Sequence, residues 1–282
     1  MIEQTLAVID DISRGVLRAW AQDAAAVADV LADQDPSWGS ESFPLAGGRV
    51  VLCGAGMYVN RAIAVGLDGE LSEGDWRTFE QRCDAVGVVP AFEASPATAA
   101  AVRVQLVARG YEIESSRAAL FCSLDVVDSL AAPNPALVIE PASGELLPLW
   151  QTTSAAGWGH ETAAARKASD AFARAAAVVD GDNLVVVRDS HDGRPVGCAS
   201  MTVSGPIATL GGMSTLPAER RRGVLAPLIV HRLRTAAALG CELATSSAEP
   251  ESNSERNLVR HGFERRFLVE TYVRQATATA IG

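Results

Sequence analysis

The order of hydrophobic and polar positions along the chain predicts helices and strands that alternate and are joined by short connections. Helices are predicted where apolar residues recur every three or four positions, and strands where short apolar runs lie between turn-forming residues. In the first half, helices are predicted at about 2–31, 72–86 and 96–109, and strands at 49–54, 57–67, 86–94 and 118–126. In the second half, helices are predicted at about 144–156, 161–178, 252–261 and from 223 onward, and strands at 136–142, 183–189, 195–203, 207–216, 241–248 and 266–275. This alternation is typical of an α/β protein with a mixed central sheet flanked by helices.

A short sequence pattern occurs twice, near the end of each half. The sequence LVARGYE begins at Leu106 and LVRHGFE begins at Leu258, and each joins a predicted helix to the last strand of its half. Glycine at such a place allows the left-handed turn that ends a helix. The intervening segment DSLAAPNPALVI contains two prolines and an asparagine, which indicates a domain boundary. We therefore predict two tandem copies of one fold, at residues 1–130 and 136–282, while a chance match of seven residues is the alternative.

Composition narrows the classes of protein to which the chain can belong. It has 282 residues, of which 48% are hydrophobic, and a net charge of -10, so it can bury a core and is a poor match for nucleic acid. The five cysteines are isolated from one another and are expected to be reduced core residues. An acidic N-terminus and the lack of a long apolar run predict a cytoplasmic protein with no membrane span. Acidic residues outnumber basic ones in residues 1–135, which fits either a cationic partner or an ordinary soluble surface.

The segment ERRRGVLAPLIVHRL carries the strongest functional signal. Three arginines, Arg220 to Arg222, precede Gly223, and an apolar helix pattern follows. A helix start exposes unpaired N–H groups and a partial positive charge, so it can bind an anion such as a diphosphate. Pro227 fits the first turn of this helix, where a missing N–H costs little. A solvated run of arginines is the alternative interpretation of the same residues.

These residues resemble the GCN5-related N-acetyltransferases (GNAT). The acetyl-CoA loop of that family, [QR]-x-x-G-x-[GA], is matched by Arg220 and Gly223, whereas Leu225 replaces the second small residue. The segment SERNLVRHGFE is similar to the family's last helix and its Gly-Phe corner. The resemblance covers about 136–275. Residues 1–130 resemble the family in element order and have no arginine-glycine loop, so the first half is expected to be a degenerate copy that binds no CoA.

The resemblance implies a set of residues that hold acetyl-CoA, the expected co-substrate. The pantetheine and acetyl groups would lie along a strand and near the last helix, and the diphosphate would lie at the arginine loop. The residues implied are Met213, Ser214, Thr215, Arg220, Arg221, Arg222, Gly223, Val224, Leu225, Ala226 and Asn257. The family's usual acid is a tyrosine four residues before the Gly-Phe corner, and Leu258 occupies that position here.

Other residues must therefore be considered for proton transfer. Tyr272, on the last predicted strand, is a candidate proton donor, with a packed edge residue as the alternative. In the segment AAGWGHE, His160 or Glu161 could take the amine proton and Trp158 could form a wall of the acceptor pocket. A surface histidine and a core tryptophan are the simpler interpretations of His160 and Trp158.

Two functions remain after weaker motifs are set aside. The stretch CGAGMYVN lacks the third glycine of a dinucleotide fingerprint, and the four histidines lack the spacing of a metal site. The first function is an N-acetyltransferase that passes the acetyl group of acetyl-CoA to a primary amine of a small molecule by direct attack. The second is a CoA-binding sensor or partner-binding module without turnover, which the missing tyrosine suggests. The acyl acceptor and the oligomeric state are not encoded in recognisable motifs.

Overall fold

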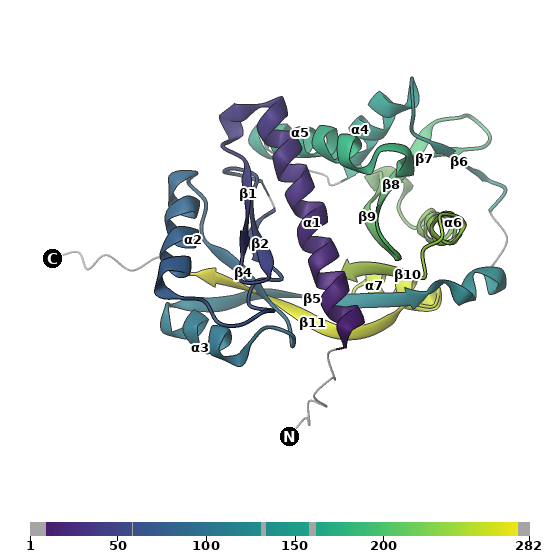
Figure 1. Ribbon diagram of the computed structural model, residues 1–282. Coiled ribbons are helices and arrows are strands. Elements are labelled where there is room, and N and C mark those ends of the chain that lie inside the picture. Colours follow the sequence, from purple (N-terminus) through teal and green to yellow (C-terminus); the bar gives the residue numbers. More distant parts are fainter. Residues whose placement is uncertain (1–9, 58, 131–133, 158–161, 276–282) are drawn as a thin grey trace. The chain divides into compact units, whose positions relative to one another are not determined.

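The computed structural model describes residues 10–57, 59–130, 134–157 and 162–275 (Figure 1). By their internal contacts the residues form two compact units. Unit 1 comprises Met1–Arg117 and Phe267–Gly282, and unit 2 comprises Ala118–Arg266. The fold is mixed α/β in both units, as the alternating pattern predicts.

Unit 1 is a mixed sheet between helices. Its strands follow the order β1-β2-β3-β4-β11, in which β3 and β4 are parallel and the other neighbours are antiparallel. The elements are α1 (Asp11–Gln34), β1 (Glu41–Leu45), β2 (Gly48–Leu52), β3 (Asn60–Ile63), α2 (Glu73–Ala85), β4 (Ala91–Ala94), α3 (Ala100–Ala108), β5 (Tyr111–Ser123) and β11 (Glu264–Arg274). Strand β1 lies where the sequence predicts a loop, because a turn with positive φ at Ala46 and Gly47 pairs it with β2.

The core of unit 1 lies between the sheet and helices α2 and α3. Trp76 and Phe79 from α2 pack with Phe92 of β4 and Tyr111 of β5, with the centroids of the Trp76 and Phe92 rings 5.7 Å apart. Helix α1 packs against β1, β2 and β3 through a separate set of buried residues, so it covers the other face of the sheet. The side chains of successive strand residues point to opposite faces, and this explains why β2 is buried almost throughout.

Unit 2 has the strand order β5-β10-β9-β8-β7-β6. Its elements are β6 (Leu137–Pro141), α4 (Leu146–Gly157), α5 (Ala163–Asp180), β7 (Val185–Asp189), β8 (Pro195–Ser204), β9 (Ile207–Thr215), α6 (Leu225–Ala238), β10 (Leu243–Ala248) and α7 (Asn253–Arg260). Trp150 of α4 is buried on one face with the alanines of α5, and its indole N–H donates to the carbonyl oxygen of Ala199 at 3.0 Å. Helices α6 and α7 pack on the other face around Leu233 and Leu258.

The last strand of each half completes the sheet of the other half's unit. In unit 1, β11 pairs antiparallel with β4, with Thr271 opposite Glu93. In unit 2, β5 pairs antiparallel with β10, with Phe121 opposite Thr245. The contacts therefore assign residues 267–275 to the unit built by the first half of the chain. The boundary near residues 130–136 as the limit of a separable fold stays a prediction.

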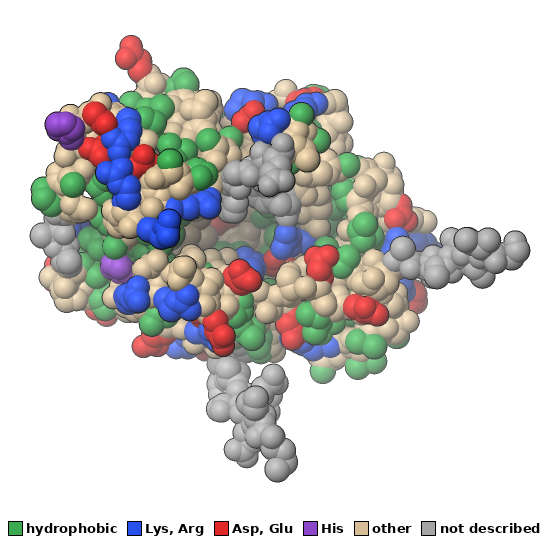
Figure 2. Space-filling view, turned by 180° about the vertical axis from the view of Figure 1, so that it is seen from behind, with side chains coloured by type: hydrophobic (Ala, Val, Ile, Leu, Met, Phe, Trp, Pro, Cys, Tyr) green, Lys and Arg blue, Asp and Glu red, His purple; other side chains and the backbone are tan. Residues whose placement is uncertain are grey.

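Charged side chains of both signs lie interspersed on the face shown in Figure 2. Many of them are paired within one unit, such as Arg18 with Asp68 at 2.7 Å in unit 1. Glu93 of β4 is a buried case, since its carboxylate lies 3.0 Å from the guanidinium of Arg61 and 2.7 Å from that of Arg117. Arg117 also stacks on the ring of Trp20, so α1 is tied to the sheet through charge as well as packing.

Candidate active site

The parallel strands β9 and β10 separate part of the way along unit 2. They pair at three positions, of which the last joins Thr245 to Thr209, while β9 continues to Thr215. Just beyond that pair the hydroxyl of Ser246 donates to the carbonyl oxygen of Leu210 at 2.9 Å, so a side chain replaces the ladder bond. The end of β9 is thereby left free of β10 and borders a pocket.

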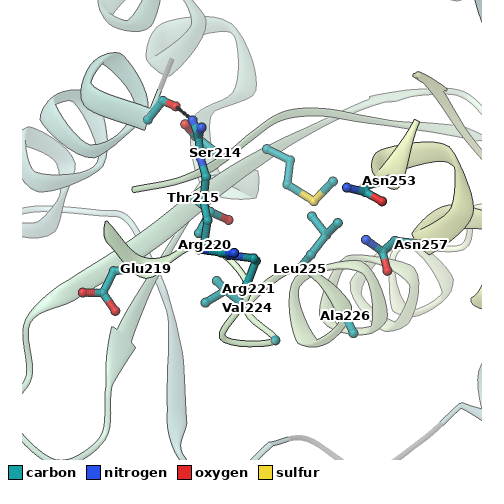
Figure 3. Close-up of a pocket in the computed structure, with 13 residues that line it drawn as sticks. Ser214, Thr215, Glu219, Arg220, Arg221, Val224, Leu225, Ala226, Asn253 and Asn257 are labelled. Carbon is teal, nitrogen blue, oxygen red and sulfur yellow. Dashed lines mark hydrogen bonds between the residues drawn. The ribbon is translucent and has the colours of Figure 1, made fainter. Parts of the chain in front are cut away.

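The pocket has a volume of about 710 Å³ and is drawn in Figure 3. Its walls come from the end of β9, the loop after β9, the first turn of α6 and one side of α7. All the predicted cofactor-binding residues except Arg222 line it, namely Met213, Ser214, Thr215, Arg220, Arg221, Gly223, Val224, Leu225, Ala226 and Asn257. The sequence interpretation missed three further lining residues, Gly157, Glu219 and Asn253. Asn253 lies one helical turn before Asn257, a spacing that could have indicated it.

The start of α6 has the properties of an anion site. No side chain caps its first N–H groups, and its first turn contains no acidic residue. Gly223 has a φ of 75° and no atom within 4 Å of the position that a Cβ would take, so its backbone is open to a ligand. Arg221 also has a positive φ, of 66°, which is a strained conformation for a residue with a side chain. The free N–H groups and the positive end of the helix therefore face the pocket.

The three arginines of the loop have different partners. Arg220 donates to the carbonyl oxygen of Gly157 at 2.9 Å, which ties the loop to the end of α4. Arg222 pairs with Glu219 and lies 3.5 Å from a carboxylate oxygen of Asp189. Arg221 makes no ion pair or hydrogen bond with the residues that the structure describes, and it lines the pocket. Of the three guanidinium groups, that of Arg221 is the one available to a bound anion.

Charged side chains at the end of the β7–β8 hairpin form ion pairs with this loop. The guanidinium of Arg194 lies 3.3 Å from carboxylate oxygens of both Glu219 and Asp189. Hydrogen bonds from Arg194, and then from Arg222, hold the pKa of the Glu219 carboxyl below its usual value. Because Glu219 stays ionised, it neutralises part of the charge of Arg222 and leaves Arg221 as the loop's free cation among the described residues.

Helix α4 ends in close contact with β9. A Cβ on Gly157 would lie 1.7 Å from the hydroxyl oxygen of Ser214, so only glycine fits there. The Ser214 hydroxyl donates to the carbonyl oxygen of Ser154 at 3.4 Å. The chain then enters residues 158–161, so Trp158, His160 and Glu161 lie outside the described residues, and their predicted roles stay predictions.

Leu258 occupies the position of the family's usual acid, and Tyr272 is the candidate proton donor. Both side chains lie in hydrophobic cores. Leu258, at the position of the usual tyrosine, is buried among the residues of α6 and β10 in unit 2. Tyr272 packs with Trp76 and Phe79 in the core of unit 1, and it is not among the residues that line the pocket. Its burial, together with the charge of Glu270, raises the pKa of its hydroxyl. The role of Tyr272 as proton donor stays a prediction.

The corresponding helix start in unit 1 is closed to an anion. Helix α2 follows β3 as α6 follows β9, but a capping box occupies its first turn. Ser72 accepts a hydrogen bond from the backbone N–H of Asp75 at 3.2 Å, and the Asp75 carboxylate accepts one from the N–H of Ser72 at 2.9 Å. Glu73 and Asp75 also place negative charge where a diphosphate would lie.

The described residues of the glycine-rich stretch CGAGMYVN connect β2 to the start of β3. The side chain of Asn60 accepts hydrogen bonds from the N–H groups of Cys53 and Gly54 at 2.7 and 3.2 Å. It also donates to the carbonyl oxygen of Met57 at 2.8 Å. These bonds satisfy backbone groups of Cys53, Gly54 and Met57, while the positive φ of Gly54 and Gly56 explains why glycine occurs here.

Within the described residues, no group of three or more His, Cys, Asp or Glu side chains could hold a metal ion. Nor does any helix in the described ranges have the length and hydropathy needed to cross a membrane.

Comparison with known proteins agrees with this geometry. Residues 145–263 match the model of the acetyltransferase (GNAT) family. No curated protein matches the chain significantly. Among solved structures, a GCN5-related N-acetyltransferase from Kribbella flavida shares 18% identity at a TM-score of 0.61, covering 90% of this chain and 97% of that one. A tandem GNAT protein from the clavulanic acid biosynthesis pathway shares 15% identity at a TM-score of 0.61, covering 96% of this chain and 98% of that one.

The family match and the site lie in the same unit. The match includes β9, the arginine loop, α6 and α7, which together form the pocket. The structural likeness extends over both halves and shows that the fold is that of the GNAT proteins. Residues 145–263 are thus similar in sequence to the GNAT acetyltransferases, and the chain has their fold.

Proposed function

We propose that the protein is an N-acetyltransferase that uses acetyl-CoA and a primary amine of a small molecule. The observation that carries this proposal is the uncapped start of α6, which faces a pocket of about 710 Å³ beside the free end of β9. Backbone N–H groups and Arg221, which has no ion pair or hydrogen bond among the described residues, supply the contacts that a diphosphate requires. The parts of the site therefore suit the two ends of an acyl-CoA, with the phosphates at α6 and the acyl group at β9.

Bound acetyl-CoA would supply an activated acetyl thioester. The residues of β9 from Met213 to Thr215 would orient the thioester, because their backbone borders the pocket without a partner strand on the β10 side. An N–H group of this strand would stabilise the negative charge that develops on the carbonyl oxygen during attack by the amine. The amide groups of Asn253 and Asn257, one turn apart on α7, would contact the pantetheine arm from the opposite wall.

The binding function belongs to unit 2 in this proposal. Unit 1 contributes no CoA site, because the capping box of Ser72 and Asp75 already satisfies the start of α2. The excess of acid in the first half supports a cationic amine as acceptor. A CoA-binding sensor is the second candidate function, and Leu258 at the position of the usual tyrosine is the observation that favours it.

The two candidates are separated by measuring binding and turnover together. Calorimetry with acetyl-CoA measures binding, and release of free thiol with a panel of small amines measures turnover, with a reaction without amine to correct for hydrolysis. Binding together with amine-dependent thiol release supports the enzyme. Binding without thiol release across the panel favours the sensor, and no binding of acetyl-CoA overturns both.

A variant tests whether the start of α6 is the binding site. Ala226→Asp places a carboxylate in the first turn of α6, imitating the acidic first turn of α2, and Ala226→Asn is the matched neutral control. Repulsion between the carboxylate and a diphosphate should weaken binding of acetyl-CoA by more than about tenfold, since roughly 1.4 kcal/mol suffices. The folded state should keep its stability, because a negative charge is favourable at a helix start. Equal affinities of the two variants would contradict the assignment.

A further inference from the structure

A fully buried arginine lies beneath the pocket strand. Arg232 of α6 is 1% exposed, and within the described chain no carboxylate pairs with its guanidinium. A buried cation costs free energy unless its N–H groups are satisfied, so its partners indicate its purpose. The guanidinium donates to the carbonyl oxygens of Leu228 at 3.2 Å, Ser200 at 3.1 Å and Gly211 at 3.0 Å.

Two of these carbonyl groups border a β-bulge. Strands β8 and β9 pair Ser200 with Gly211 and Cys198 with Ser214, so β9 has one more residue than β8 between these pairs. Such a bulge bends the strand and leaves the extra residue outside the ladder. Gly212, inside the bulge, has a φ of 54°, and a Cβ there would lie 2.4 Å from the hydroxyl oxygen of Ser200. The bulge therefore requires glycine at position 212, because a larger side chain would clash with Ser200.

Arg232 holds both strands of the bulge at once. The same Nη1 atom reaches Ser200 on β8 and Gly211 on β9, while Nη2 lies 2.9 Å from the sulfur of Met213. Met213 follows the bulge directly and lines the pocket. The third bond, to Leu228, returns to the first half of α6, the helix whose start forms the anion site. One side chain thus connects the acyl-side strand to the phosphate-side helix.

We propose that Arg232 is a positioning residue that fixes the β9 bulge, so that the backbone of Met213 to Thr215 faces the pocket at the correct distance from the start of α6. The inference rests on the proposed function, because it assigns the bulge a role in orienting the thioester. A displacement of about 1 Å in such a strand can cost about 10²-fold in rate. Substitution of Arg232 should therefore lower the rate of acetyl transfer and leave the contacts to the phosphates intact.

Three variants separate this role from simple packing. Arg232→Met fills similar space without donors, and Arg232→Lys keeps the charge but has one nitrogen in place of the three that contact Leu228, the bulge and Met213. Arg234→Met is the matched control on the same helix, because Arg234 donates to the carbonyl oxygen of Leu130, away from β9. Circular dichroism and thermal melting establish which variants are folded, and Arg232→Lys keeps the test open if Arg232→Met does not fold.

Two readouts then apply to the folded variants. In amide hydrogen exchange, the segment 211–215 should exchange at least tenfold faster in Arg232→Met than in the parent, with no change in Arg234→Met. In calorimetry and kinetics, affinity for CoA should stay within about threefold, while kcat with acetyl-CoA falls by about 10²-fold at a nearly unchanged KM. Arg232→Lys should lie between the parent and Arg232→Met.

The inference is overturned if a folded Arg232 variant keeps both the exchange rate of residues 211–215 and a kcat within threefold of the parent. Equal losses in Arg234→Met and Arg232→Met would also overturn it, since they would indicate a general effect on α6. A parent protein that binds no acetyl-CoA contradicts the proposed function instead. In that case, amide hydrogen exchange still tests whether Arg232 stabilises the bulge.

Discussion

Removing the guanidinium of Arg221 should weaken CoA binding far more than removing that of its neighbour Arg222. Arg221→Ala deletes the one loop arginine that has no ion pair or hydrogen bond within the described residues, and it keeps a β-carbon at the strained φ of 66°. The backbone strain is therefore the same in both proteins. Any change in affinity then reports the lost side chain.

The expected magnitude follows from the partners of the two arginines. Charge-assisted hydrogen bonds to a phosphate are worth roughly 1.5 to 3 kcal/mol, so Arg221→Ala should weaken binding about 10- to 150-fold. The side chain of Arg222 is 51% exposed, is already paired with Glu219 and does not line the pocket, so it should contribute little to the binding of a phosphate. Arg222→Ala should therefore change affinity by less than about threefold.

Calorimetry with CoA at two salt concentrations measures these differences. Pantetheine, which lacks the diphosphate, is the matched ligand control. It should bind Arg221→Ala and the parent with the same affinity. Arg221→Lys should recover part of the loss, because it keeps the charge without the planar fork. An affinity of Arg221→Ala for CoA within twofold of the parent, or an equal loss for pantetheine, would refute the reasoning.

Three further predictions concern unit 1 and the stability of the fold. Glu93→Gln removes the buried carboxylate that pairs with two partly exposed arginines and should destabilise the protein by about 1.5–3 kcal/mol in urea unfolding, whereas the exposed Glu114→Gln should have little effect; similar midpoints would contradict the prediction. As the predicted proton donor, Tyr272 should lower kcat by about 10²-fold or more when changed to Phe, and a kcat within about threefold of the parent would show that it only packs in the core of unit 1. Hydrogen bonds from Arg265 lower the pKa of Glu255, so its stabilising contribution is present above the unfolded pKa of about 4.3 and is lost as the pH falls through the lower folded value. Glu255→Gln should flatten the profile of stability against pH in that acid range. An unchanged profile would show that Glu255 does not cause the pH dependence.

The arginine loop and the strand and helix start beside it were predictable from sequence, because these parts are adjacent in the chain. A strand, arginines, a glycine and a helix start follow one another from Met213 to Ala226, and the structure brings them to one pocket. Gly157 comes from another element, so only the folded chain places it beside that loop. The distinction between Arg221 and Arg222 also depends on distant carboxylates, in particular Asp189 at the end of β7.

Strand pairing was the part of the fold that the sequence could not reveal. The alternation along 266–275 predicts a strand, and the structure has β11 at Glu264–Arg274. Periodicity identifies a strand and its buried face, but it carries no information on which strand lies beside it. The pairing of β11 with β4 depends on backbone hydrogen bonds and side-chain packing over a long stretch of sequence, such as Tyr272 opposite Phe92.

This pairing has a consequence for the order in which the protein can fold on the ribosome. Strand β4 emerges early, yet the strand that covers its edge, residues 267–274, is made near the end of translation. Until then the nascent chain presents an open strand edge of the kind that pairs with other chains. Truncated products that stop before Phe267 would keep that edge and should associate with one another or be held by chaperones. The residues that line the pocket and the strand that completes unit 1 thus lie in different parts of the second half of the chain.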